Sequence, residues 1–113
     1  MNTKLLNHLD PIALHNEALA AAFKAQQKFL DEHGELAYCG FAWVELYVDG
    51  RSPFIKALVK AGIAEKGWGK PYIIWNPTKT GTQSMDVKEA ASHAYAKVFQ
   101  QYGVTAYMGS RPD

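Results

Sequence analysis

The sequence predicts a small single α/β domain with about three helices and three strands, in the order helix, strand, helix, strand, helix, strand. Two observations predict it. A chain of 113 residues suits one domain, because at this size roughly two-thirds of the unfolded surface can be buried. Helical and extended patterns alternate along the chain, which is typical of βαβ units and of parallel strands. Since the first strand is long and could pair antiparallel, an α+β arrangement is the alternative.

The longest extended pattern covers residues 36–48 and predicts the central strand. It is rich in β-branched and aromatic residues, lacks proline and carries one charge, Glu45, which is the composition of a strand. Alternation places Phe41, Trp43 and Glu45 on one side and small or aliphatic residues on the other. Both sides are mostly apolar, so we expect both to be covered by other parts of the chain. Two shorter strands are expected, over residues 72–75 and 104–108.

Three helices are expected, and each begins at a capping side chain and ends at a glycine. The capping side chain accepts hydrogen bonds from free backbone N–H groups, and glycine adopts the left-handed conformation that ends many helices. Residues 1–9 precede the first helix as a loosely held lead-in, so the domain is expected to span residues 10–113. The pairs of cap and glycine are Asp10 and Gly34, Ser52 and Gly62, and Ser84 or Asp86 with Gly103.

Charge is nearly balanced overall but divided along the chain. The sequence has 12 basic and 11 acidic side chains. Residues 1–50 contain three basic and seven acidic side chains, whereas residues 51–84 contain six basic ones and a single acidic one. A basic middle third indicates an anionic partner, and ordinary solvated lysines are the alternative interpretation.

Several classes of protein are excluded by what the sequence lacks. The single Cys39 cannot form an internal disulfide, and we expect it to be a buried structural thiol. The N-terminus has too short an apolar run for a signal peptide, so a cytoplasmic protein without a membrane span is expected. Walker, dinucleotide-binding, CxxC and HExxH motifs are absent, so neither a cofactor nor a metal site is expected.

An anion-binding pocket is expected if the three strands are parallel, because their C-terminal ends would then meet at one edge of the sheet. The segments 49–52 and 76–84 would both arrive there, each leading into a helix N-terminus, which favours anions. The C-terminal tail would lie beside them, unless its arginine pairs with Asp113 or Asp49. The residues expected to form this pocket are Arg51, Ser52, Lys79, Ser84 and Arg111.

A second candidate set consists of aromatic residues and one carboxylate. Trp68, Tyr72 and Trp75 are interleaved with lysines, which indicates contacts with a nucleotide or nucleic acid. Trp68 lies between two glycines and is expected either to plug the core or to face a ligand. Glu45, on the central strand, is a weak candidate for a catalytic general base, and an ion pair with a lysine explains it equally well.

Three segments of the chain carry a resemblance to a known group of proteins. These are Cys39–Val44, Gln83–Ala90 and Gly109–Asp113. They resemble a family of small hypothetical proteins encoded by bacteriophages and prophages. The likeness spans residues 36–113, and the helix at 10–33 lies outside it. The resemblance implies expression in the cytoplasm of a bacterial host, and it supplies no catalytic residue.

The sequence therefore favours a binding protein over an enzyme. The first hypothesis is a phage-type cytoplasmic protein that binds a phosphate-bearing ligand, either a nucleotide or nucleic acid. The alternatives are a protein that interacts with or inhibits a host component, and a small hydrolase or transferase that uses Glu45. Because three strands leave two open edges and the chain is rich in aromatic residues, a homodimer is also expected.

Overall fold

The computed structural model describes residue 6 and residues 8–113, which form one small domain of helices and strands. In this part of the chain the expected alternation of three helices with strands is confirmed, and a two-residue strand raises the number of strands to four. The lead-in expected at residues 1–9 lies mostly outside the described residues, although Leu6 is buried and joins the core. The elements in order are α2 (Pro11–His33), β1 (Gly40–Leu46), α3 (Pro53–Lys60), β2 (Glu65–Lys66), β3 (Tyr72–Trp75), α4 (Met85–Gln101) and β4 (Ala106–Pro112).

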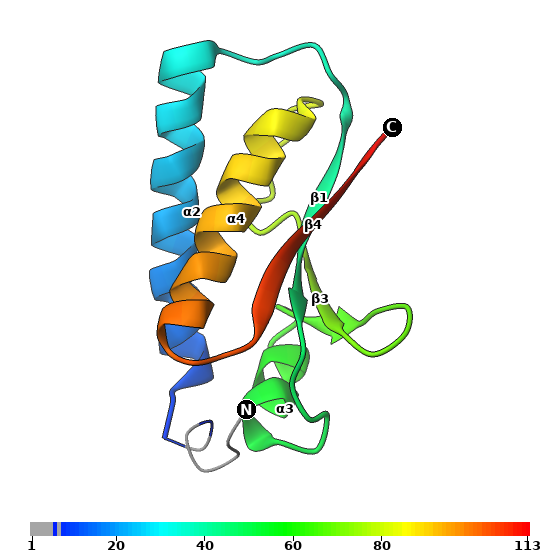
Figure 1. Cartoon of the computed structure of the whole chain (residues 1–113). Coiled ribbons are helices and arrows are strands. Elements are labelled where there is room, and N and C mark those ends of the chain that lie inside the picture. The colour runs from blue at the N-terminus through cyan, green and yellow to red at the C-terminus, as the bar shows by residue number, and fades with distance from the viewer. Residues whose placement is uncertain (1–5, 7) are drawn as a thin grey trace.

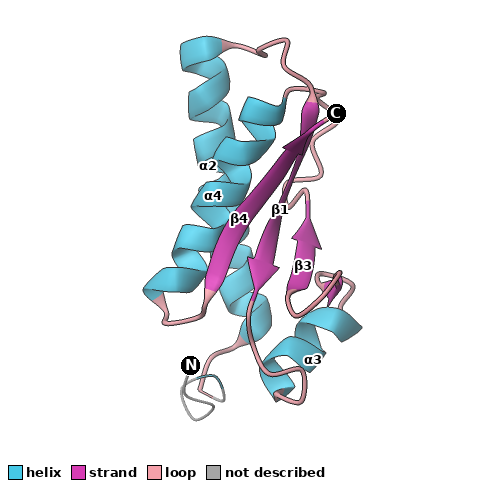
Figure 2. Ribbon diagram, turned by 45° about the vertical axis from the view of Figure 1, so that its right-hand side comes forward, coloured by secondary structure: helices cyan, strands magenta, loops and turns pink. Residues whose placement is uncertain are grey.

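The four strands form one antiparallel sheet in the order β2-β3-β1-β4 (Figure 2). The α+β alternative describes this arrangement, and the condition of parallel strands, on which the expected anion pocket depended, is not met. β1 and β2 both pair antiparallel with β3 and so run in the same direction. The connection through α3 therefore joins β1 to a strand that is parallel to it, β2. The next strand, β3, turns back and lies between β1 and β2 in the sheet. This connectivity is that of the split βαβ, or ferredoxin-like, motif.

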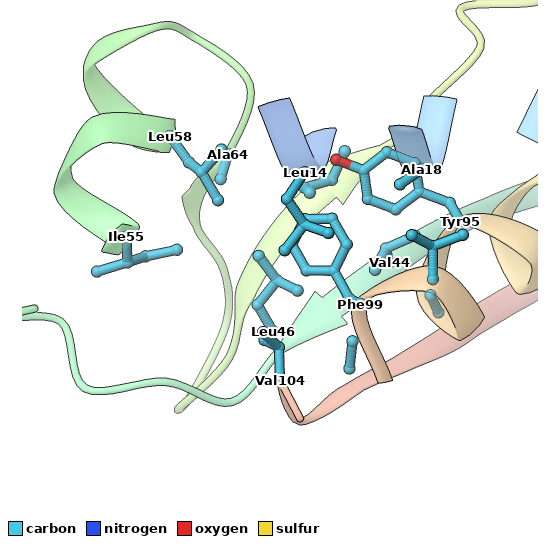
Figure 3. Close-up of a cluster of buried hydrophobic side chains, with 14 of the residues drawn as sticks. Leu14, Ala18, Val44, Leu46, Ile55, Leu58, Ala64, Tyr95, Phe99 and Val104 are labelled. Carbon is cyan, nitrogen blue, oxygen red and sulfur yellow. The ribbon is translucent and has the colours of Figure 1, made fainter. Parts of the chain in front are cut away.

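One face of the sheet is covered by helices. α4 packs directly on β1 and β4, and α2 packs against α4 (Figure 1). The inward side chains of β1, including Val44 and Leu46, are fully buried and lie in one cluster with Tyr95 and Phe99 of α4 (Figure 3). α3 lies at one end of the sheet and adds Ile55 and Leu58 to the same cluster. A single core thus joins all three helices to one face.

The other face of the sheet is not covered by any described part of the chain (Figure 2). Phe41, Trp43 and Glu45 on this face are only half-buried, and Trp75 and Tyr107 are exposed. The expectation that both faces of the central strand would be covered was therefore wrong. The reason is that the described helices pack on the inner face or at one end of the sheet, which leaves none for the outer face.

The expected helix caps form with one exception. Asp10 Oδ1 accepts hydrogen bonds from the backbone N–H groups of Ile12 and Ala13, each at 3.1 Å, and Ser52 Oγ accepts one from Ile55 at 3.4 Å. Ser84 is the N-cap residue of α4, but its side chain makes no capping hydrogen bond. In the part of the chain that is described, the helices are all too short or too polar to traverse a bilayer.

Candidate functional site

The anion pocket expected from parallel strands does not form. The segment 49–52 follows the C-terminal end of β1. At the other end of this strand, Cys39 forms an isolated antiparallel β-bridge with Ser84, and Phe41 pairs with Arg111 of β4. Arg51 and Ser52 therefore lie at one end of the sheet, and Ser84 and Arg111 lie at the other. Antiparallel pairing is the physical reason, because it places the ends of β3 and β4 beside the start of β1.

Two members of the expected pocket have structural partners instead. The Arg51 guanidinium donates from Nε and Nη2 to the two carboxylate oxygens of Asp49, at 3.2 and 3.0 Å. These hydrogen bonds lower the pKa of Asp49 and raise the pKa of Arg51. Ser52 is buried as the cap of α3. Lys79 lies in the loop after β3 and lines a different pocket, beside His15.

The expected aromatic set is partly brought together. Trp68 and Trp75 line one cleft, and Trp68 is fully exposed, so it does not plug the core. Tyr72 lies opposite Leu46 and therefore faces the helical side of the sheet, where Lys66 Nζ lies 4.9 Å from the centre of its ring. Cys39 is exposed, which contradicts the buried thiol expected there.

The uncovered side of the sheet carries a row of aromatic rings. Trp43 and Trp75 are directly opposite each other on β1 and β3, and their rings stack with centroids 5.6 Å apart and an angle of 6° between their planes. Phe41 packs beside Trp75 at 5.7 Å, and Tyr47 meets Tyr107 edge to face at 6.0 Å. We call this surface the aromatic face. It consists of Phe41, Trp43, Tyr47, Trp75 and Tyr107.

An open cleft of about 430 Å³ lies over the aromatic face and is bordered by the turn between β2 and β3. The stacked pair of Trp43 and Trp75 forms its floor, and Trp68 stands at its rim. Arg111 also lines the cleft, and its guanidinium lies 5.4 Å from the centre of the Phe41 ring. Within the described chain, Arg111 forms no ion pair with Asp113 or Asp49. Its charge is therefore available to a ligand.

Glu45 lies in the same cleft and is held by two neighbours on its own strand face. Its Oε2 accepts a hydrogen bond from Trp43 Nε1 at 2.9 Å, and its Oε1 accepts one from the Tyr47 hydroxyl at 2.8 Å. The bond to the carboxylate raises the pKa of Tyr47. No lysine of the described chain forms the alternative ion pair with Glu45. Since each carboxylate oxygen has two lone pairs, Glu45 can still accept a hydrogen bond from a ligand.

Gly109 is a site residue that the sequence did not reveal. It lies opposite Trp43 on β4, and a Cβ added there would be 2.5 Å from Trp43 Nε1 and 2.8 Å from Glu45 Oε2. The missing side chain therefore makes room for the indole to lie over β4 while it holds Glu45. A lone glycine inside an extended pattern is a signal of such close approach.

The described chain has no metal-binding cluster, and the chain matched no protein with which it was compared. No group of three potential metal-ligating side chains occurs among residue 6 and residues 8–113. Comparisons with protein families, with curated proteins and with solved structures found no match for this chain. The resemblance to phage-encoded proteins is not tested by these comparisons and stays a prediction.

Proposed function

We propose that this protein binds single-stranded nucleic acid on the aromatic face. One observation carries the proposal: stacked and neighbouring rings stand uncovered on a four-stranded antiparallel sheet. Each base that stacks on such a ring contributes about 1–3 kcal/mol, with little dependence on sequence. RNA-recognition motifs bind bases on the aromatic residues of a four-stranded sheet in this way, and the likeness here is one of architecture alone.

Charge around the cleft favours stacking as the main source of affinity. Arg111 brings a positive charge to the cleft, but Glu45 and Glu65 also line it, and the ammonium of Lys66 lies over Tyr72 on the helical side of the sheet. The six basic residues of the middle third do not gather there, because Arg51 is paired with Asp49 and two of the lysines lie on α3. We therefore expect few phosphate contacts, and a slope of log affinity against log salt of about −1 to −2, since each contact on a single strand contributes about −0.7.

Binding to a labelled oligonucleotide, followed by fluorescence anisotropy, tests the proposal. Trp75→Ala should weaken binding by about five- to a hundred-fold, the equivalent of one lost stacking contact. Tyr38→Ala is the matched control, because Tyr38 is an exposed aromatic residue that precedes β1 and lies outside the cleft. If the native protein fails to bind single strands at about 50 mM salt, where phosphate contacts are strong, the proposal is wrong.

A second candidate function is self-association or contact with a host protein through the edge strand β4. β4 has seven residues, and within the described chain it pairs only with β1. An open edge of this length presents unpaired backbone groups that a second strand can satisfy. Light scattering would reveal the homodimer expected from the sequence, and Ser110→Pro on β4 should weaken it, because proline removes a backbone donor. A protein that stays monomeric at high concentration would exclude self-association.

An enzymatic role has the least support. Glu45 would be its base, yet both carboxylate oxygens already accept hydrogen bonds from Trp43 and Tyr47. No described serine, cysteine or histidine hydrogen-bonds to Glu45 as a nucleophile or proton relay would.

The resemblance to phage-encoded proteins supports a role in the bacterial cytoplasm during infection, where single-stranded nucleic acid is an available partner.

A further inference from the structure

A second pocket lies between α2 and the loop after β3, and Trp75 is the one lining residue that it shares with the cleft over Trp43. It has a volume of about 280 Å³ and is bordered by α2, by the segment after α3 and by the loop after β3. Its walls include the apolar side chains of Leu19, Phe23 and Ile74, together with Trp75. Its polar groups are His15, Lys79 and Thr78, and no aspartate or glutamate lines it.

The hydrogen bond between His15 and Tyr95 determines where the proton of this imidazole lies. His15 Nδ1 and the Tyr95 hydroxyl are 2.6 Å apart. Tyr95 is completely buried, and burial raises its pKa, so the phenol keeps its proton. If Nδ1 carried the proton and donated, the buried Tyr95 O–H would have no acceptor among the described residues. Tyr95 therefore donates, Nδ1 accepts, and neutral His15 has its proton on Nε2.

His15 Nε2–H is free to donate to a ligand. His15 is partly buried, and Nε2 has no hydrogen-bond partner among residue 6 and residues 8–113. The only fully buried side-chain polar atoms that lack a partner in the described chain are the hydroxyls of Ser84 and Ser92, so Nε2 is reached by solvent. Burial first, and then the charge of Lys79, lower the pKa of His15, which keeps the ring neutral in this tautomer near pH 7.

Lys79 supplies a second donor at the same pocket. It forms no salt bridge in the described chain, and its side chain is exposed. The loop that carries it is held by a hydrogen bond from Lys79 N to the Asn76 carbonyl at 2.8 Å, and by one from Asn76 Nδ2 to the Thr80 carbonyl at 3.0 Å. Thr78 is already bonded to Gln26. The pocket thus offers two free donors, one of them cationic, among apolar walls.

We propose that this pocket binds a small organic anion, with a carboxylate or phosphate head on His15 Nε2–H and Lys79 Nζ and an apolar body against Leu19 and Phe23. Donors in a pocket whose lining has no acidic side chain favour a negative head, and the apolar walls favour an aliphatic or aromatic body. The pocket is separate from the nucleic-acid surface, although Trp75 borders both. Either site can exist without the other.

Calorimetric titration with phenyl phosphate, phenylacetate and inorganic phosphate tests this proposal. Phenyl phosphate or phenylacetate should bind, and inorganic phosphate should bind more weakly than either because it lacks the apolar body. Which of the two organic probes binds more tightly distinguishes a phosphate ligand from a carboxylate ligand. If neither organic probe binds at millimolar concentration, or if inorganic phosphate binds as tightly, the proposal is wrong.

Variants and a spectroscopic readout localise the site. Lys79→Gln should weaken the bound probe by about fivefold or more, since it removes one charge-assisted hydrogen bond, while Lys56→Gln on the exposed side of α3 is the matched control and should bind normally. Nitrogen NMR of His15 should show the proton on Nε2 before the probe is added and a shift of that resonance afterwards. Equal effects of the two lysine variants, or a proton on Nδ1, would overturn the assignment.

Discussion

Replacement of Gly109 by alanine should disturb the aromatic face while leaving the core intact. The new Cβ would lie 2.5 Å from Trp43 Nε1 and 2.6 Å from its Cε2, closer than any tolerated contact. The atoms in the way belong to two half-buried side chains, Trp43 and Glu45, so the indole and the carboxylate can move aside. That movement breaks the 2.9 Å hydrogen bond to Glu45 and separates the stacked pair of Trp43 and Trp75.

The cost can be estimated from these contacts. A lost hydrogen bond to a partly exposed carboxylate and a displaced ring each destabilise the protein by about 1 kcal/mol. Alanine in place of glycine stabilises it by about 0.4–1 kcal/mol, because it lowers the conformational entropy of the unfolded chain. We expect a net loss of about 1 kcal/mol of unfolding free energy, measured by urea denaturation. Affinity for single strands should fall by about five-fold or more, the equivalent of one stacking contact.

Gly81→Ala is the control for this change. A Cβ at Gly81 meets nothing within 4 Å, so both stability and binding should stay near those of the native protein. Should Gly109→Ala be as stable as the native protein and keep the indole N–H resonance of Trp43 unchanged, the account of how Glu45 and Trp43 are held would be refuted.

Three further predictions concern stability. Ser92→Ala should be neutral or stabilise by up to about 1 kcal/mol in urea denaturation, because the buried Ser92 hydroxyl has no partner among the described residues; a clear loss would indicate a partner. Asp10→Ala should destabilise by about 0.5–2 kcal/mol, since Asp10 caps α2, and an unchanged unfolding midpoint would contradict that role. The pKa of His15 is lowered from 6.5 in the folded protein, so the unfolded chain binds more protons in acid and stability should decline as pH falls through 6.5 towards the lowered value. His15→Asn should flatten this decline, and an equally steep one would show that other groups cause it.

The sequence predicted local structure well where a single side chain decides it. Asp10 and Ser52 cap their helices as expected, because a cap depends on the few residues beside it. The direction of the strands depends on β2, which has only two residues and therefore leaves no periodic pattern to detect. Without β2, the path from α3 to β3 resembles a simple parallel crossover. The expected anion pocket depended on that crossover and failed with it.

The aromatic face was visible in the sequence but was assigned to the wrong environment. The alternation of Phe41 and Trp43 with buried residues has the same appearance whether a helix or solvent covers the ring side. Only the number and placement of helices decide between these cases, and that is a property of the whole fold. Of the residues expected to contact a ligand, Trp68, Trp75 and Arg111 do share a cleft, and Glu45 lies with them.

The indole N–H resonances of the three tryptophans provide the most direct test of the aromatic face as a nucleic-acid surface. During titration with a single-stranded oligonucleotide, the resonances of Trp43 and Trp75 should shift and saturate together, because both rings form the floor of the cleft. The backbone amides on the exposed side of α2 should stay in place, and duplex DNA should produce little change. Binding that leaves both tryptophan resonances unchanged, or that shifts the amides of α2 instead, would contradict the account.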